Sequence, residues 1–223
     1  IWSSMTLSKS IFLSSAKGRS TGHAVFLDST GRTYSLAAHS LPSARGQGEP
    51  VTGRVNPPPG AKFVATLMGA DDQLFVFASS AGYGFIVPFS ELLSKNRSGK
   101  AVLKAPTHSN AMAPQAVNDL EKDLLVMVSN IGRLLVFPAK ELPKLNRGKG
   151  NKMLNIPTKA LAAGEEWMQA FAIVPAGSGV EVHSGKRHVT LSAKDLAHYQ
   201  GERGRRGNKL PRGYQKADRL IVP

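Results

Sequence analysis

Small basic loops that contain glycine recur along the chain at intervals of roughly 50 residues. The four loops are Ala44–Gly46, Asn96–Lys100, Asn146–Gly150 and Gly201–Gly207. Guanidinium and ammonium groups bind phosphate oxygens, and glycine lets a phosphate backbone approach the main chain closely. Because the cations return at the same phase of a repeated unit, we expect them to line one edge of the assembled repeats. The pattern therefore predicts a surface for a long polyanion.

The densest cation cluster is the loop Gly201–Gly207, which four further cations follow: Lys209, Arg212, Lys216 and Arg219. A solvated or disordered tail is the alternative interpretation of this segment. The internal loops share its phase in the repeat, which favours phosphate binding for the whole set. Neutralising Arg203, Arg205 and Arg206 together is then expected to lower affinity for a polyanion and to flatten its salt dependence.

The overall charge agrees with an anionic partner. The chain has 29 Lys and Arg against 15 Asp and Glu, a formal net charge of +14 and a sequence pI of about 10.2. Charge of this size favours nucleic acid or anionic surfaces, although a basic surface kept for solubility is an alternative. Aromatic residues make up only 7% and the basic loops contain no Phe or Trp, so single-strand binding by base stacking is disfavoured. Backbone contact with duplex DNA fits better.

Several chemistries are excluded or disfavoured. The chain has no cysteine, which removes disulfides, thiolate catalysis and sulfur-ligated zinc. His183 and His188 lie close in sequence, but no carboxylate is placed to complete a metal site with them. Gly179–Arg187 lacks the spacing and the final Ser or Thr of a phosphate-binding P-loop. Four similar basic loops and no unique polar cluster argue against an enzyme active site, and we expect no cofactor and no metal in this domain.

The segments between the basic loops are predicted to be strands. Residues 24–36, 74–87, 124–136 and, more loosely, 180–189 are short apolar, β-branched or aromatic segments around a glycine turn, which is typical of hairpins. Their phenylalanines are expected to be core: Phe75, Phe77, Phe85 and Phe89. Further strands are predicted at Val51–Val55, Lys62–Leu67, Ala101–Lys104, Met153–Ile156 and Met168–Val174, and single-turn connectors at Ser90–Leu93, Ala139–Leu142 and Ala193–Ala197.

Repeats of this length with about four strands each predict blades arranged radially. We expect one all-β domain over residues 1–223, a propeller-like ring of about five four-stranded blades. The approximate repeats are 24–73, 74–123, 124–173 and 174–223, and residues 1–23 supply a partial blade in which Ser10–Ser15 resembles a final strand. An open ring with an incomplete first blade is an alternative to a closed one. No apolar run approaches the length of a membrane span, and the chain, which begins at Ile1, is expected to be a fragment of something longer.

Four strings also carry a family resemblance: Leu41–Pro50, Ala81–Phe85 with Asp72 before it, Asn146–Lys152 and Gly201–Gly207. They resemble the C-terminal domain of the A subunit of DNA topoisomerase IV, from about residue 10 to the end. The resemblance implies a β-pinwheel, in which neighbouring blades exchange a strand and a basic outer rim binds and bends the DNA segment to be transported. The related gyrase domain carries a Gln-Arg-Arg-Gly-Gly-Lys-Gly box. The nearest strings here, Gly46–Gly48 and Arg205–Arg206, do not match it in full, so bending or capture is expected in place of strong one-handed wrapping.

The same resemblance implies that DNA cleavage belongs to a distant N-terminal region, so none of the tyrosines here is expected to be the nucleophile. The expected partners are double-stranded DNA, the remainder of the A subunit and the separate ATPase (B) subunit of a heterotetramer. The fragment itself is expected to be monomeric, cytoplasmic and chromosome-associated. The residues expected to hold DNA are Arg45, Arg54, Lys95, Arg97, Lys100, Lys144, Arg147, Lys149, Lys152, Arg203, Arg205, Arg206 and Lys209.

Three alternatives remain at this point. A propeller-type protein-interaction scaffold would use its faces, with an incidentally basic surface, and would bind partners with little salt dependence. A propeller enzyme would need a unique polar cluster near a central channel. RNA would satisfy the same charges as duplex DNA, and competition between the two nucleic acids would distinguish them.

Overall fold

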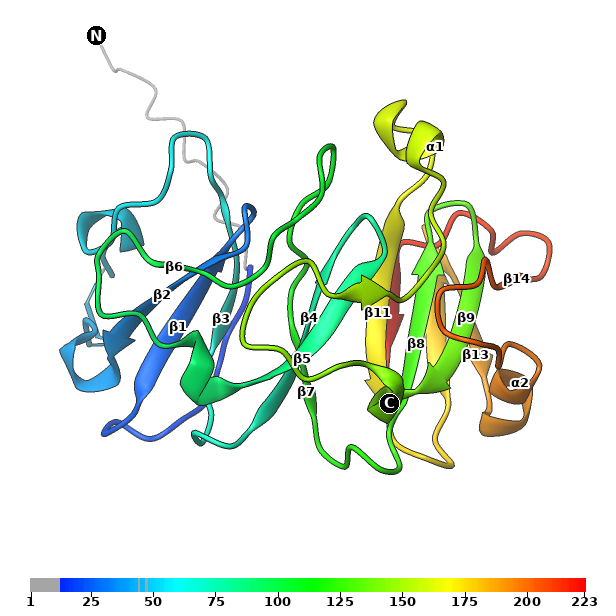
Figure 1. Ribbon diagram of the computed structural model, residues 1–223. Coiled ribbons are helices and arrows are strands. Elements are labelled where there is room, and N and C mark those ends of the chain that lie inside the picture. Colours follow the sequence, from blue (N-terminus) through cyan, green and yellow to red (C-terminus); the bar gives the residue numbers. More distant parts are fainter. Residues whose placement is uncertain (1–12, 44, 47) are drawn as a thin grey trace, which may run out of the picture.

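Strands dominate the structure, and they form four separate antiparallel sheets (Figure 1). The computed structural model describes residues 13–43, 45–46 and 48–223. The strands are β1 His23–Asp28, β2 Arg32–Ala37, β3 Phe63–Leu67, β4 Leu74–Ser79, β5 Tyr83–Pro88, β6 Lys100–Ala101, β7 Gln115–Val117, β8 Leu124–Ser129, β9 Arg133–Pro138, β10 Asn151–Lys152, β11 Met168–Val174, β12 Val180–Ser184, β13 Arg187–Leu191, β14 Asn208–Lys209 and β15 Arg219–Ile221. The helical turns are η1 Ala38–Ser40, η2 Val51–Gly53, η3 Phe89–Leu92, η4 Ala139–Glu141, α1 Thr158–Ala162 and α2 Ala193–Ala197.

Each sheet is built on one hairpin, and we call the sheets blades 1 to 4 in chain order. The hairpins are β1–β2, β4–β5, β8–β9 and β12–β13. Their turns contain Gly31, Gly82, Gly132 and Gly185, all at positive φ, a conformation that glycine adopts without the steric cost of a side chain. The predicted hairpins are confirmed, as are the connectors, which appear as η3, η4 and α2.

The outermost strand of a blade comes from the following repeat. The sheet orders are β3-β1-β2-β6, β10-β5-β4-β7 and β11-β8-β9-β14. Thus β6 follows the hairpin of blade 2 but pairs with β2 of blade 1. In the same way, β10 follows the hairpin of blade 3 and pairs with β5 of blade 2, and β14 follows the hairpin of blade 4 and pairs with β9 of blade 3. We call β6, β10 and β14 the donor strands. The expected all-β pinwheel with strand exchange is confirmed, and it ties each pair of neighbouring repeats through the backbone.

Blade 4 has only three strands, in the order β13-β12-β15, because the part of the chain that the structure describes contains no further repeat to supply a donor. Its outer face carries polar side chains: Glu181 and His183 are half-buried, and His188 is exposed. At the other end, the segment that follows the first basic loop has no preceding described hairpin to join. It forms η2, so the predicted strand Val51–Val55 is wrong. The described sheets form an open array, in the order of the chain (Figure 1).

The number of complete blades differs from the expected five. The described residues form four sheets, three with four strands and one with three. Residues 13–22 form no strand, although the Ser14 hydroxyl accepts a hydrogen bond from the Thr66 amide on β3. Most of the predicted strand Ser10–Ser15 lies outside the described residues, as do residues 1–12 of the expected partial blade.

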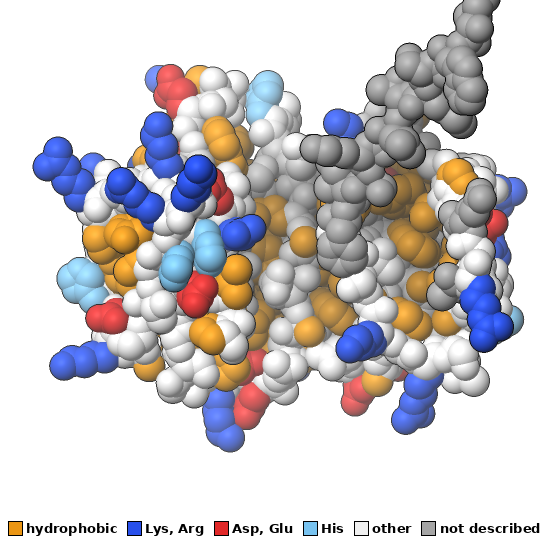
Figure 2. All heavy atoms as spheres, turned by 180° about the vertical axis from the view of Figure 1, so that it is seen from behind, with side chains coloured by type: hydrophobic (Ala, Val, Ile, Leu, Met, Phe, Trp, Pro, Cys, Tyr) orange, Lys and Arg blue, Asp and Glu red, His pale blue; other side chains and the backbone are white. Residues whose placement is uncertain are grey.

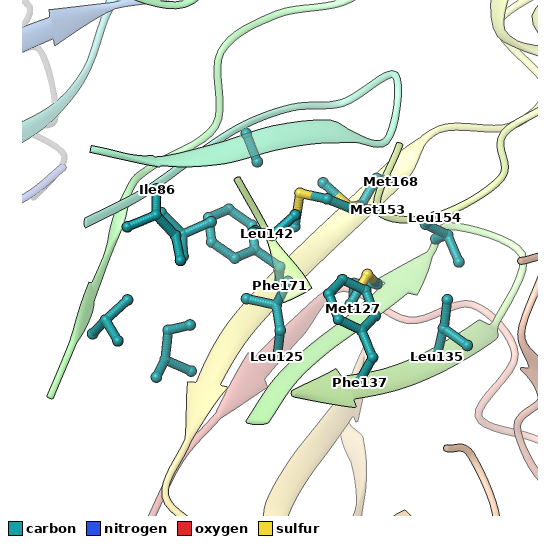
Figure 3. Close-up of a cluster of buried hydrophobic side chains, with 14 of the residues drawn as sticks. Ile86, Leu125, Met127, Leu135, Phe137, Leu142, Met153, Leu154, Met168 and Phe171 are labelled. Carbon is teal, nitrogen blue, oxygen red and sulfur yellow. The ribbon is translucent and has the colours of Figure 1, made fainter. Parts of the chain in front are cut away.

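The apolar core consists of three clusters, one between each pair of neighbouring blades. Alternation along the strands produces this arrangement. On β8, Leu125 and Met127 face blade 2, whereas Val126 and Val128 belong to the cluster shared with blade 4. Figure 3 shows the middle cluster, where Leu125, Met127 and Phe171 of blade 3 lie opposite Ile86 of blade 2. The phenylalanines predicted as core are buried in the same way. Because both faces of the inner blades are buried, the blades cannot pack independently.

Glycine is required where a hairpin turn meets the next repeat. The Gly82 carbonyl accepts hydrogen bonds from the amides of Met153 and Leu154, at 2.7 and 3.2 Å. A Cβ at Gly82 would clash with the carbonyl oxygen of Leu154, and one at Gly31 would clash with that of Leu103. At Gly185 nothing described lies within 4 Å of the equivalent Cβ, because no exchanged segment covers the turn of blade 4.

The substitutions Gly82→Ala and Gly185→Ala should therefore differ in cost. Both place alanine at positive φ, near 80° and 61°, which costs about 1–2 kcal/mol. Gly82→Ala also forces the exchanged segment away, and we expect it to lower the free energy of unfolding by about 1–3 kcal/mol more than Gly185→Ala. Urea denaturation of the two variants measures the difference. Equal losses would show that the exchange contact contributes nothing to stability.

A buried carboxylate organises the first turn. The side chain of Asp28 accepts hydrogen bonds from the Thr30 amide and hydroxyl, the Arg32 amide and, at 2.7 Å, the Tyr34 hydroxyl. Asp28 and Tyr34 are both fully buried. Burial, followed by the bond to Asp28 and its charge, raises the pKa of Tyr34 well above its ordinary value of about 10.

Because the folded state holds this proton more tightly, Tyr34 stabilises the fold fully below pH ~10 and loses that contribution as pH rises further. Tyr34→Phe should remove the bond to Asp28, lower the free energy of unfolding at pH 7 by about 1–3 kcal/mol, and reduce the loss of stability between about pH 9 and 11. Urea denaturation across that range, with Tyr214→Phe as control, measures both effects. An unchanged alkaline slope in Tyr34→Phe would contradict the assignment.

Candidate nucleic-acid interface

The basic loops of successive repeats are joined into one band. The amides of Asn56, Lys104 and Asn155 each donate to a carbonyl of the next basic loop, those of Arg97, Gly148 and Arg205 respectively, at 2.7–3.0 Å. Each loop thus lies beside the segment that follows the preceding loop. We call residues 48–56, 95–104, 144–155 and 201–209 the basic band. The cations that sequence reasoning selected by their phase in the repeat are brought together along it, except Arg45, which is exposed and directly follows a residue outside the described part of the chain.

Backbone packing, more than ligand access, explains three of the loop glycines. Gly99, Gly150 and Gly207 have positive φ. A Cβ at any of them would clash with a carbonyl oxygen on the outer strand of the preceding blade: Thr33, Gly84 or Leu134. Glycine at these positions lets the donor strand join the preceding blade. The Arg-Gly pattern therefore has a structural cause in addition to any contact with phosphate.

Several predicted DNA-binding cations also donate hydrogen bonds within the protein. The Arg97 guanidinium donates to the carbonyls of Gly53 and Arg54, at 3.0 Å each. Arg203 donates to the Lys152 carbonyl at 3.0 Å. Two other cations form ion pairs: Arg54 with Glu49 at 2.9 Å, and Lys100 with Glu91 at 3.2 Å. Arg97 and Arg203 thus join neighbouring loops, whereas Arg54 and Lys100 are engaged within their own repeats. Only the remaining N–H groups of these four side chains are available for a ligand.

Arg206 forms the most buried ion pair of the band. It approaches both oxygens of Glu166, at 2.8 and 2.9 Å, and donates to the Asn155 carbonyl. Glu166 is only 4% exposed. The neighbouring Arg205 pairs with Glu202, but both of those side chains are more than 70% exposed, so that pair contributes little. Sequence reasoning missed this pair because the two residues are 40 positions apart.

The most accessible cations lie near the middle and at the end of the band. Five are exposed, and among the described residues no hydrogen bond or ion pair engages their side chains: Lys95, Lys144, Arg147, Lys149 and Lys209. The Lys149 ammonium lies 4.3 Å from the centre of the Tyr83 ring, and that of Lys152 lies 5.8 Å from it. This attraction orients the two ammonium groups while leaving their positive charge. Figure 2 shows, on one face, blue Lys and Arg side chains projecting around the outline of the molecule.

Two further cations that contact the basic band were not selected from the sequence. Arg32 opens β2 and donates to the carbonyls of Ser98 and Gly99, while Arg133 opens β9 and approaches that of Gly207. Both follow a hairpin glycine, a repeated position that would have been a usable signal. Arg32 also lines a depression of about 610 Å³ with Lys104 and Arg147. This hollow places three cations around one concave part of the band.

The described part of the chain contains no group of three or more His, Asp or Glu residues placed to hold a metal ion. His183 contacts Glu181 at 3.0 Å and stacks on His188, with ring centres 5.3 Å apart. None of the helices described here has the length and apolar character needed to cross a membrane.

Comparisons with known proteins agree with this geometry. A sequence model of the DNA gyrase C-terminal domain, a β-propeller, matches residues 73–106 and 123–162. The A subunit of DNA topoisomerase 4 from Pseudomonas aeruginosa is 54% identical over 211 residues, and that from Escherichia coli is 44% identical. Each match covers 95% of this chain, which spans 28% of the length of these relatives.

Solved structures resemble the whole arrangement. The E. coli ParC C-terminal domain has 44% sequence identity and a TM-score of 0.86, over 92% of this chain and 83% of that one. The DNA gyrase A C-terminal domain has a TM-score of 0.69 at 11% identity, over 93% of this chain and 68% of that one, which shows a shared fold.

The two ion pairs of the last loop allow a matched test. Glu166→Gln removes the buried charge that Arg206 faces, so we expect the free energy of unfolding to fall by about 1–3 kcal/mol. Glu202→Gln makes the same chemical change in the exposed pair with Arg205 and should cost about 0–1 kcal/mol. Urea denaturation at neutral pH measures both. Similar losses would contradict an anchoring role for Glu166.

Proposed function

Because this chain belongs to the family of C-terminal domains of the topoisomerase IV A subunit, which are accessory domains of a type II topoisomerase, we propose that it binds and bends duplex DNA along the basic band. The carrying observation is the continuity of the band. The loops of successive repeats are linked by backbone hydrogen bonds, so their cations follow one path across the blades. A path of this kind fits a regularly charged backbone better than it fits a small ligand.

Bending follows from the distribution of cations over several blades. A straight duplex would contact only part of a band that extends from blade to blade, whereas a bent duplex would reach more of its cations. Smooth bending of a site of about 20–30 bp costs about 1–6 kcal/mol, which additional phosphate contacts can offset. These contacts recognise charge and shape, so we expect little base specificity.

The role in the larger protein is also a proposal. We infer that DNA cleavage belongs to the region of the parent A subunit that this chain does not span, and that a separate ATPase subunit completes the enzyme. The domain itself is then non-catalytic, without a cofactor, and associated with the chromosome through DNA. Its part would be to hold the transported segment and to tune which DNA substrates the enzyme prefers.

Binding to duplexes of two lengths tests the proposal. A short linear duplex contacts one or two loops, while a duplex long enough to follow the whole band contacts all of them. We expect tighter binding of the long duplex, with a steeper dependence of log K on log salt, in a fluorescence anisotropy titration. Equal, weak binding would favour a protein-interaction scaffold instead. Preferential binding of an RNA duplex in competition would assign the band to RNA.

A charge-matched pair of variants locates the contact. Arg147→Ala with Lys149→Ala removes two exposed cations of the band, and Lys122→Ala with Lys194→Ala removes two exposed cations outside it. We expect the first variant to bind the long duplex more weakly and to lose about 0.9 from the salt slope for each phosphate contact removed. The second should bind nearly as the unaltered protein does. Equal weakening of both would show that only net charge matters.

A further inference from the structure

The outer edge of β13 differs from the equivalent edge of every other described blade. In blades 1 to 3 the outer strand, β2, β5 or β9, is paired with a donor strand from the next repeat. In blade 4 the outer strand is β13, which among the described strands pairs with β12 alone. Unpaired edges expose backbone N–H and C=O groups that can pair with another extended chain.

Blade 4 also has an arginine at the position from which blades 1 and 3 bond to their donor segments. Arg32 and Arg133 are the first residues of β2 and β9, and each donates to a carbonyl of the incoming segment. Arg187 is the first residue of β13 and is exposed. Among the described residues, no hydrogen bond engages its guanidinium. Blade 4 therefore has both the edge and the arginine with which two other blades receive a donor.

The three donors show which chain segment such an edge accepts. Each has a glycine at positive φ, then a polar residue, then a small or basic residue, and then an apolar residue: Gly99–Val102, Gly150–Met153 and Gly207–Leu210. The glycine is needed because a Cβ would clash with the acceptor strand. Recognition is largely by the backbone, as in other cases of strand addition, and the glycine supplies the specificity.

A second copy of this chain is a poor source of that segment. Its three donors already occupy their own blades. The equivalent segment of the first repeat is found through Asn56, which bonds to the next loop as Lys104 and Asn155 do. Gly99 and Gly150 lie five residues before Lys104 and Asn155, and Val51 lies five residues before Asn56, so Val51 occupies the position at which the donors have glycine. The segment of the first repeat forms η2. A β-branched residue at this position resists the left-handed conformation that a donor needs.

We propose that the outer edge of β13 is a strand-addition site for an extended segment of a separate polypeptide that carries the donor pattern. The glycine carbonyl of that segment accepts a hydrogen bond from the Arg187 guanidinium. The next two residues add a fourth strand to the sheet of blade 4. The site consists of a sheet edge and Arg187 and includes none of the exposed cations of the basic band, so it does not require the proposed DNA binding.

An appended donor tests the site in the full chain. A copy of Asn96–Leu103, the segment that β2 accepts, is joined to the C-terminus through a flexible Gly/Ser linker, which makes its encounter with β13 intramolecular. We expect hydrogen exchange of the β13 amides to slow by at least about tenfold, as newly paired amides are protected. The measurement is made at a concentration where sedimentation shows a monomer.

Two matched variants make the result specific. A copy with its glycine replaced by valine, equivalent to Gly99→Val, should give no protection, and Arg187→Ala should weaken the protection given by the unaltered copy. A labelled free peptide of the same sequence should bind the unaltered protein, and Arg187→Ala should reduce that binding. Unchanged exchange in β13, or equal protection by the valine version, would overturn the proposal.

Discussion

The structure depends on one constraint, the exchange of an outer strand between neighbouring repeats. The donor strands are only two residues long, yet they join each blade to the next through backbone hydrogen bonds and glycine contacts. The apolar clusters between blades depend on the same geometry, since they include residues of the exchanged segments such as Leu103 and Leu154. Fold, core and candidate DNA surface therefore share one set of contacts.

The exchange also explains why the candidate DNA surface is continuous. A basic loop directly precedes each donor strand, so the strand carries its loop to the preceding blade. Part of the positive charge is used within the protein, as in the pair of Arg206 with Glu166, while Arg147 and Lys149 point their charge outward. The cations of the band thus divide into side chains that join parts of the protein and side chains that remain exposed to solvent.

The ends of the described array follow from the same rule. The described residues contain no hairpin before the first repeat to which its segment could be donated, and that segment forms η2. Among the described strands no donor pairs with β13, and blade 4 has a polar outer face at Glu181 and His183 in place of an apolar one. Terminal units of repeat proteins commonly show a polar outer face for this reason.

The sequence by itself determined the hairpins, the glycine turns, the core phenylalanines and the repeated phase of the basic loops, because these depend on local periodicity and residue type. Only the tertiary structure decided that Val51–Gly53 is helical, that Arg97 and Arg203 bond to neighbouring loops, and that Glu166 faces Arg206. Each of these outcomes depends on a partner far away in the chain or on the lack of one. Local pattern carries no information about such partners, whereas packing between repeats sets them directly.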